Sequence, residues 1–289
     1  MKLANRNAII TGGNQGFGRM LALKFVKEGA SLVICARDFR KLKDTLKELT
    51  QIAAPGQRIT ILQTDVSVEK DVRQLVAASI EALGRIDILV NNAGVYGPKG
   101  SIEKVDWQEW VKAIEINLFG TVLLCKEIIP HMKRNNYGKI INLSGGGATA
   151  PLPGISAYAA SKAAVVRLTE TLAEECRSFN IDINAVAPGA LNTRLLDEVL
   201  SAGPAAVGQA FYEKALKQKE TGGTPLEKGA ELCSYLASSE TDGITGKLIS
   251  AVWDPWEKLA SYKAQLQQSD IYTLRRIIPE GRDEKWGQK

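Results

Sequence analysis

The sequence predicts a doubly wound α/β fold, in which helices cover both faces of one mostly parallel sheet. From residue 6 to residue 250, short apolar runs rich in β-branched residues alternate with longer amphipathic segments, which is the pattern of parallel strands joined by crossover helices. The alternation continues without a break, and a glycine-rich turn, Gly12 to Gly18, follows the first run. We therefore expect one sheet in one domain rather than two smaller domains.

Seven apolar runs predict seven parallel strands, at residues 8–10, 32–35, 59–62, 86–90, 139–143, 181–186 and 247–250. The amphipathic segments between them predict helices at residues 17–28, 40–52, 69–83, 107–134, 157–178 and 226–237. Because crossovers between parallel strands are right-handed, these helices are expected on both faces of the sheet.

Two segments fall outside this alternation. Residues 192–224 are helical in pattern but have no matching strand, so we expect an insertion over the carboxyl ends of the strands, where open α/β sheets bind ligands. Residues 252–289 begin with Val-Trp-Asp-Pro-Trp and end near Trp286, and about 38 residues are too few to hold a core of their own. The expected organisation is one domain, residues 1–251, which includes the insertion, with a C-terminal appendage, residues 252–289.

Composition excludes several classes of function. The 37 basic residues are interspersed with 32 acidic ones for a net charge of +5, which does not favour nucleic acid as a partner. No apolar run approaches the roughly 18 residues that span a bilayer, and no targeting segment is visible, so the expected compartment is the cytoplasm. Four scattered cysteines are expected as reduced core thiols.

The single histidine, His131, excludes a histidine-based triad and a multi-histidine metal site. It follows Pro130 near the end of a predicted helix, and we expect it at the surface. No metal site is predicted.

Gly12, Gly16 and Gly18 allow a tight turn whose backbone approaches a pyrophosphate and presents helix N-terminal N–H groups to it. Arg19 stands where a phosphate-binding loop of the Walker type has lysine, which disfavours that alternative. The motif alone would equally suit a plain strand-to-helix turn.

The end of the second strand predicts the cofactor. NAD enzymes place an acid there, whereas this chain has Ala36 followed by Arg37, a residue that binds a 2′-phosphate bidentately. NADP is therefore the expected cofactor, with NAD as the alternative. The neighbouring acid Asp38 and the uncharged Gln15 weaken the expectation, and Arg37 would also suit a solvated position at the start of a helix.

Tyr158 and Lys162 lie four residues apart on a predicted helix and so project from one face. A free tyrosine has a pKa of about 10, and a nearby ammonium and a cationic nicotinamide both favour the phenolate. The pair predicts proton transfer to or from an alcohol oxygen. Taken alone, it would also suit an ordinary amphipathic helix.

Five motifs in register resemble the short-chain dehydrogenase/reductase family over roughly residues 5 to 250. They are the glycine turn from Thr11, Asn91-Asn-Ala-Gly94, Asn117, the Tyr158-Lys162 pair, and Pro188-Gly189 with Thr193. The spacing of the glycines resembles the shorter reductases rather than the extended nucleotide-sugar epimerases. The resemblance implies a Rossmann-type sheet and an NAD(P)(H)-dependent oxidoreductase that interconverts a secondary alcohol and a ketone.

By the same resemblance, Tyr158 is the catalytic acid/base, Lys162 its tuner and Asn117 the holder of a proton-relaying water. Asp65 and Val66 would hold the adenine. The implied cofactor-binding residues are Gly12, Asn14, Gln15, Gly16, Phe17, Gly18, Arg37, Asp65, Val66, Asn92, Ala93, Gly94, Tyr158, Lys162, Pro188, Gly189, Leu191 and Thr193.

One family feature is missing. A serine normally stands thirteen positions before the tyrosine, and here that position is Gly145, with Ser144 one place early. On a strand, a one-residue offset turns the side chain to the opposite face unless the strand is bulged. The backbone N–H groups of residues 145–147 or a hydroxyl of the substrate would be the substitute, or the glycines only avoid a clash. The alternative function is a dinucleotide-binding regulatory or catalytically weakened subunit.

The expected partners are a small alcohol or ketone, with a sugar or a phosphate-bearing molecule as a candidate, and further copies of the chain. In the family, the helices that begin near Trp107 and Ala157 pair between subunits, which implies a homodimer or homotetramer. The second helix has an apolar stripe that we expect to contribute to that pairing, namely Ala163, Val166, Leu168 and Leu172.

Overall fold

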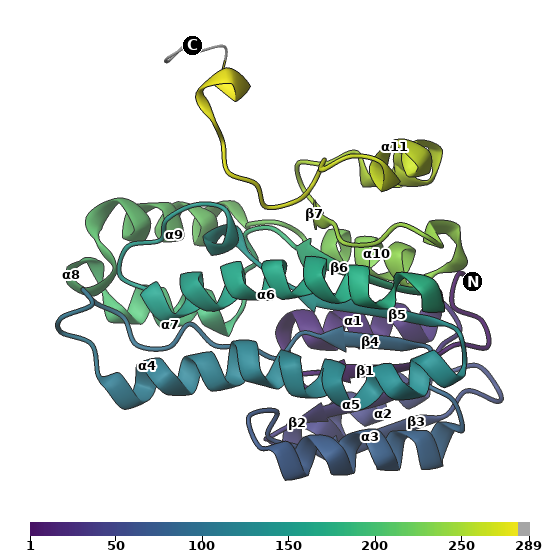
Figure 1. The fold of residues 1–289 in the computed structure, drawn as a ribbon. Helices are drawn as coiled ribbons and strands as arrows, with labels where there is room; N and C mark the ends of the chain where they lie inside the picture. The colour runs from purple at the N-terminus through teal and green to yellow at the C-terminus, as the bar shows by residue number, and fades with distance from the viewer. Residues whose placement is uncertain (283–289) are drawn as a thin grey trace.

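A computed structural model describes residues 1–282 of the chain, so that the last part of the appendage, with Trp286, lies outside the described residues. Its centre is a sheet of seven parallel strands in the order β3-β2-β1-β4-β5-β6-β7 (Figure 1). The strands are β1 (Asn7–Thr11), β2 (Ser31–Ala36), β3 (Ile59–Gln63), β4 (Ile88–Asn91), β5 (Gly138–Leu143), β6 (Ile181–Ala187) and β7 (Leu248–Ser250). The doubly wound, Rossmann-type fold is confirmed.

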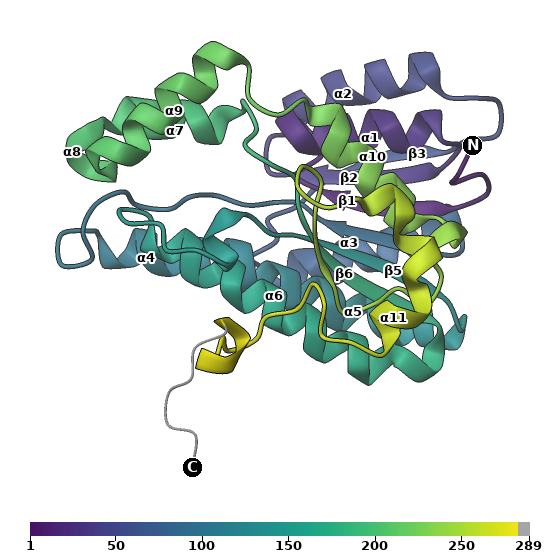
Figure 2. The same cartoon turned by 90° about the horizontal axis from the view of Figure 1, so that it is seen from above.

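Helices cover both faces of the sheet, as Figure 2 shows. One layer holds α1 (Gly16–Lys27), α2 (Phe39–Ile52) and α10 (Leu226–Ala237). The other holds α3 (Glu69–Leu83), α6 (Ser156–Cys176) and a long helical run made of α4 (Trp107–Ile114), η1 (Glu115–Phe119) and α5 (Gly120–Arg134). Each layer buries its own apolar cluster against the sheet, which explains why the strands are apolar on both faces.

The parallel register brings the carboxyl ends of the strands to one edge of the sheet. Ile9 of β1 pairs with Val33 of β2 and with Leu89 of β4, so the loops after these three strands emerge side by side. The predicted site residues follow β1 to β6, and the strand order reverses between β1 and β4, where ligands bind in sheets of this kind.

The insertion forms three helices, α7 (Arg194–Ala202), α8 (Pro204–Val207) and α9 (Gln209–Thr221), which project beyond this edge of the sheet (Figure 2). They share a small apolar cluster of their own, in which Leu196, Val199 and Val207 are buried. We refer to α7, α8 and α9 together as the flap.

The described part of the appendage lies against the domain. It contains η5 (Trp256–Tyr262), α11 (Lys263–Gln267) and η6 (Pro279–Arg282), and Trp256, Leu259 and Leu266 bury their side chains in the core of the first helix layer. The chain then passes alongside the outermost strand β7, where the backbone N–H of Leu248 donates to the Tyr272 carbonyl at 2.7 Å. The appendage therefore completes the domain and covers part of its edge strand.

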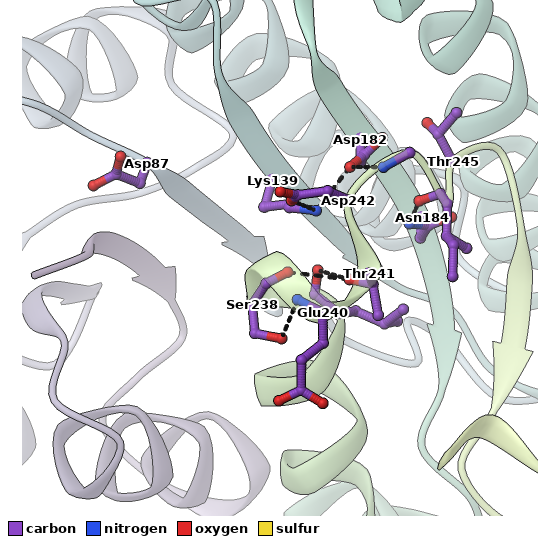
Figure 3. Close-up of polar contacts among 12 residues, drawn as sticks. Asp87, Lys139, Asp182, Asn184, Ser238, Glu240, Thr241, Asp242 and Thr245 are labelled. Carbon is purple, nitrogen blue, oxygen red and sulfur yellow. Dashed lines mark hydrogen bonds and ion pairs between the residues drawn. The ribbon is translucent and has the colours of Figure 1, made fainter. Parts of the chain in front are cut away.

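At the amino ends of β5 and β6, a buried ion cluster stabilises the sheet (Figure 3). The Lys139 side chain is 1% exposed and its Nζ lies 2.7 Å from both Asp182 Oδ2 and Asp242 Oδ1. Asp182 also accepts a hydrogen bond from the N–H of Gly243 at 2.9 Å. Because a buried charge is tolerated only when paired, this cluster holds the turn before β7 against the sheet, at the end opposite the predicted site.

The four cysteines are buried free thiols, as expected. The prediction for His131 was wrong: the residue is 8% exposed, and its Nε2 accepts the backbone N–H of Ile86 at 3.1 Å. The C-terminal part of α5 packs against the turn before β4. His131 is buried there because it accepts the Ile86 N–H of that turn, a backbone donor that needs a partner. None of the helices in residues 1–282 has the length and apolar character that crossing a bilayer requires.

Candidate active site

The glycine turn has the backbone shape of a phosphate cradle. Gly12 and Gly16 have positive φ angles of 66° and 52°, which L side chains rarely adopt. A Cβ on Gly18 would collide with the carbonyl oxygen of Gly12, so α1 packs directly onto the turn. α1 begins at Gly16, and the Gln15 side chain makes no cap bond to it. The first N–H groups of the helix thus remain available to an anion, and a pyrophosphate fits.

Two basic side chains stand beside this turn. Arg37 is exposed directly after β2, as expected. Asp38 caps α2 instead, because its carboxylate accepts the N–H groups of Arg40 and Lys41. Lys41 was not predicted: its Nζ donates to Gln15 Oε1 at 3.0 Å and so brings a second positive charge to the turn.

The loop after β4 is fixed to the end of β1. The N–H groups of Asn92 and Ala93 both donate to Thr11 Oγ1 at 3.0 Å, and Asn92 Nδ2 donates to the Thr11 carbonyl at 2.8 Å. These bonds place Gly94 so that a Cβ there would lie 3.2 Å from Asn117 Oδ1 and 3.7 Å from Lys162 Nζ. Three separate motifs of the sequence meet at this glycine.

Asn117 lies in η1, a π-helical segment within the long helical run, where a single continuous helix was expected. Its Oδ1 accepts the N–H of Val95 at 2.9 Å, while its Nδ2 donates to the Val95 carbonyl at 2.8 Å and to Ser161 Oγ at 3.0 Å. π-Helical turns concentrate at functional sites, and this one contains Asn117, which lies across Gly94 from Lys162.

Tyr158 and Lys162 lie on α6 with their side chains together: Lys162 Nζ is 5.7 Å from the centre of the Tyr158 ring. Lys162 Nζ donates to the Leu143 carbonyl at 2.7 Å. Burial lowers the pKa of Lys162 to about 8. The pKa of Tyr158 is raised, first by burial and then by Tyr96, so the expected lowering of this pKa is not seen in the protein alone.

Gly145 directly adjoins Tyr158. A Cβ at residue 145 would collide with the Tyr158 hydroxyl, so the tyrosine occupies the space that a serine there would fill. Gly147 is also sterically required, since its Cβ would lie 2.9 Å from the backbone of Ala159, whereas a Cβ on Gly146 would meet nothing within 4 Å. Avoidance of a clash therefore accounts for two of the three glycines.

Ser144 does not replace the missing hydroxyl. Its N–H still pairs with the Val186 carbonyl at 2.8 Å, and Gly145 continues in an extended conformation with φ 179° and ψ 174°. Without a bulge, residues 144 and 145 face opposite sides. The Ser144 side chain is buried, and its Oγ has no hydrogen-bond partner among the described residues.

Tyr96 is the nearest aromatic neighbour of Tyr158 in the described pairs, and the sequence did not single it out. The two rings meet edge to face, with centroids 4.7 Å apart and an angle of 79° between their planes. Tyr96 also packs with the apolar cluster of the flap. Beside it, Lys99 Nζ pairs with Glu198 of α7 at 3.3 Å, which ties the loop after β4 to the flap.

A cavity of about 690 Å³ opens between this loop, the segment before α6 and the flap. Its lining includes Lys99, Lys104, Leu152, Ser156 and Val207. Ser156, in this lining, lies two residues before Tyr158 in the chain. Its walls mix apolar side chains with basic ones.

The remaining predicted residues lie at the same edge of the sheet. Asp65 accepts the N–H and hydroxyl of Ser67; burial alone would raise its pKa, but these bonds hold the pKa below its ordinary value. A Cβ on Gly16 would lie 3.5 Å from Thr193, which joins the glycine turn to the segment after β6. That segment begins with Pro188 and Gly189, and Leu191 packs partly against the core.

Two predicted cofactor residues have mainly structural side chains. The Phe17 side chain is buried against Gly229 of α10, so only the backbone of Phe17 is available to a bound phosphate. Val66 is buried against Gly120 of α5. The missed residues had weak signals: Lys41 lies one helical turn beyond Arg37, and Tyr96 lies two residues beyond Gly94.

Comparisons with known proteins agree with this geometry. A family model described as short chain dehydrogenase matches residues 6–202. The (2S)-[(R)-hydroxy(phenyl)methyl]succinyl-CoA dehydrogenase subunit BbsD of Thauera aromatica is 34% identical over 255 residues, covering 86% of this chain and 96% of the relative. L-fucose dehydrogenase of Oryctolagus cuniculus is 34% identical over 249 residues, covering 85% of this chain and 83% of the relative.

Among solved structures, levodione reductase matches with a TM-score of 0.79 and 27% identity, covering 90% of this chain and 99% of that one. Sequence motifs, fold and relatives thus agree over the whole domain. The chain belongs to the short-chain dehydrogenase/reductase family and is an NAD(P)-dependent oxidoreductase that acts on CH–OH groups.

Proposed function

We propose that this protein interconverts a secondary alcohol and a ketone with NADP(H), using Tyr158 as the acid/base. The observation that carries the proposal is the meeting of Tyr158, Lys162 and Asn117 beside Gly94, at the edge where the strand order reverses. These residues come from α6 and η1, and they are assembled only by the fold.

The residues divide the chemistry in a simple way. Bound nicotinamide supplies or accepts the hydride at the substrate carbon, and Tyr158 donates or takes the proton at the substrate oxygen. Burial keeps Tyr158 protonated at neutral pH, the form that donates in ketone reduction. The Lys162 ammonium, held by the Leu143 carbonyl, stabilises the phenolate that this donation leaves. Asn117 is the residue proposed to hold a relaying water.

The preference for NADP rests on two cations. Arg37 follows β2 without an acid at Ala36, Asp38 is engaged in capping α2, and Lys41 reaches Gln15 at the rim of the turn. A 2′-phosphate between Arg37 and Lys41 would accept charge-assisted hydrogen bonds from both.

Fluorescence titration with NADPH and NADH tests this preference. We expect tighter NADPH binding, and a loss of about ten- to hundredfold in NADPH affinity in each of the variants Arg37→Ala and Lys41→Ala, because a hydrogen bond to a charged group contributes about 1.5–3 kcal/mol. Lys43→Ala, at an exposed position on the same helix, is the control and should leave both affinities unchanged. Tighter NADH binding by the parent would contradict the proposal.

The substrate class is proposed to be a polyol or sugar. A relative of 34% identity carries the name L-fucose dehydrogenase, and Lys99, Lys104 and Ser156 in the otherwise largely apolar cavity wall offer hydrogen bonds to a substrate with several hydroxyls. Cofactor turnover across a panel of ketones, sugars and polyols, with Tyr158→Phe as the control, measures the activity. Turnover that persists in Tyr158→Phe would remove this residue from the mechanism.

The second candidate is a dinucleotide-binding subunit with weakened catalysis, which Gly145 favours. The variant Gly145→Ser separates the two functions. We expect its turnover to fall on the order of 10²-fold, because the new Cβ displaces the Tyr158 hydroxyl from its position. A large rise in turnover would instead show that the glycine marks decayed catalysis.

We also propose a cytoplasmic location. All four cysteines are buried free thiols, which suits a reducing compartment. Fractionation of the producing cells tests this location.

A further inference from the structure

The proposed reaction requires a donor that polarises the substrate oxygen, and Gly145 has no side chain to supply it. The inference that follows rests on the proposed function of Tyr158. A second donor near the Tyr158 hydroxyl would share the negative charge that develops on the substrate oxygen during hydride transfer.

The hydroxyl and amide groups nearest to Tyr158 in sequence or contact are mostly engaged. Both polar atoms of the Asn117 amide are used by Val95 and Ser161, and the Ser161 hydroxyl donates to the Tyr158 carbonyl at 2.7 Å. Ser156 Oγ accepts the indole N–H of Trp110 at 3.1 Å. Ser144 faces the opposite side of the strand end.

Tyr96 differs from these groups. Its ring packs edge to face on Tyr158 with the ring centroids 4.7 Å apart, and none of the side-chain hydrogen bonds described for residues 1–282 engages its hydroxyl. It is half-buried and packs against the flap cluster as well, so its ring lies between Tyr158 and the flap.

We propose that Tyr96 is a catalytic residue whose O–H donates a hydrogen bond to the substrate oxygen, in place of the serine that residue 145 lacks. In ketone reduction, the hydride adds to the carbonyl carbon, Tyr158 transfers its proton to the oxygen, and Tyr96 keeps its own proton throughout. Alcohol oxidation reverses these steps with the same balance.

The electrostatic surroundings of Tyr96 agree with this role. Burial, and after it the negative charge of Glu198, raise its pKa above the ordinary value, so the hydroxyl remains a donor across the working pH range. The two phenols also differ in their charged neighbours: the Lys162 ammonium adjoins Tyr158 and favours release of its proton, whereas the Glu198 carboxylate favours retention of the proton on Tyr96.

The variant Tyr96→Phe tests the assignment, because it keeps the ring that packs on Tyr158 and removes only the hydroxyl. We expect kcat/KM to fall by about 10²- to 10³-fold, mostly through kcat, with the dissociation constant for NADPH unchanged. Tyr212→Phe is the matched control, since Tyr212 packs in the same flap cluster, and it should remain within about twofold of the parent.

The outcomes separate this inference from the proposed function. If Tyr158→Phe abolishes turnover and Tyr96→Phe stays within about threefold of the parent, Tyr96 donates nothing to the transition state and the assignment is wrong. If the parent turns over no substrate of the panel, or Tyr158→Phe remains active, the proposed function fails and the role of Tyr96 fails with it. An equal loss in Tyr96→Phe and Tyr212→Phe would show a packing effect and would also overturn the assignment.

Discussion

The buried ammonium group of Lys162 destabilises the folded protein. Burial lowers its pKa from 10.5 to about 8, which corresponds to about 3 kcal/mol of unfavourable interaction for the charged form. Between pH 8 and 10.5 the unfolded chain binds a proton that the folded chain has released, so the free energy of unfolding rises with pH in this window. Below about pH 8 both states carry the proton, and the cost is fully present.

We therefore predict that the stability of the parent, relative to Lys162→Met, rises by about 3 kcal/mol from pH 7 to pH 10.5. Urea unfolding of both proteins at intervals of one pH unit measures the difference. Lys70→Met, at an exposed position on α3, is the control and should show no such trend. A difference that stays constant with pH would mean that the buried ammonium is not destabilised.

The glycines beside Tyr158 differ in the space around them, which gives a second prediction. Gly147→Ala should lower the free energy of unfolding by about 1–3 kcal/mol, because its Cβ would lie 2.9 Å from the rigid backbone of α6 at Ala159. Gly146→Ala, with open space around it, should change stability by less than about 0.5 kcal/mol. Thermal unfolding compares the two, and equal effects would contradict the packing described for this loop.

At the scale of elements, Glu170 fastens the appendage to α6. The side chain is buried, accepts the N–H of Leu274 at 2.6 Å and pairs with Arg275 at 3.3 Å, while Arg167 binds both Glu170 and the Leu274 carbonyl. Breaking this group leaves the segment after Tyr272 with few contacts to the domain, because hydrogen bonds to a charged group carry much of the attachment.

We predict that Glu170→Ala exposes this segment to trypsin, with cleavage after Arg275 or Arg276 at least about tenfold faster than in the parent, since loss of bonds to a charge amounts to about 1.5–3 kcal/mol. Mass spectrometry of timed digests follows the cleavage. Glu174→Ala, one turn further along α6 and paired only with Arg177 among the described ion pairs, is the control. Similar cleavage rates in both variants would show that Glu170 does not hold the segment.

The elements themselves were largely predictable, because strands and helices follow from local patterns of apolar residues. The order of the motifs was enough to predict that Tyr158, Lys162 and Gly94 share one site. Residues whose role depends on a contact across the fold were not predictable. Lys41 of α2 meets Gln15, and Tyr96 meets Tyr158 of α6, only because the fold brings a loop residue against a residue of a separate helix.

Other predictions from the sequence were wrong because a distant segment of the chain buries or contacts the residue. His131 was expected at the surface, but its partner, the N–H of Ile86, lies 45 positions earlier in the chain. Val166 of α6 was expected in an apolar stripe between subunits, yet its side chain is fully buried within the subunit, in a small cluster with Ala148 and Ala185. A single helix was expected around Asn117, where hydrogen bonds to Val95 and Ser161 accompany a π-helical turn. Each outcome depends on long-range packing, which a local pattern does not encode.

At the scale of the whole molecule, charge is organised differently at the two edges of the sheet. At the amino edge, Lys139 is neutralised by Asp182 and Asp242 and stabilises the turn before β7. At the carboxyl edge, no carboxylate is paired with Lys162 among the described ion pairs, and Arg37 remains exposed. The two ends of the sheet therefore differ: Lys139 has two carboxylate partners, whereas Lys162 is held by a backbone carbonyl.

The outer face of the long helical run presents an apolar surface to solvent and predicts self-association. Trp107, Phe119 and Val122 are 64%, 50% and 36% exposed, and all three lie on the run from α4 to α5 that Figure 1 shows along one side of the molecule. We propose that the protein forms a homodimer through this face, because exposed apolar patches of this kind mark interfaces.

Light scattering at micromolar concentration should give the mass of a dimer or of a larger even assembly for the parent. Phe119→Glu combined with Val122→Glu should give a monomer, because charged residues are depleted from the centre of interfaces and their burial there is unfavourable. Leu216→Glu on the flap is the control: the side chain is exposed to a similar degree, 39%, but lies on a different surface, so this variant should keep the mass of the parent. A monomeric parent, or a double variant that retains the parent mass, would show that subunits do not meet through this face.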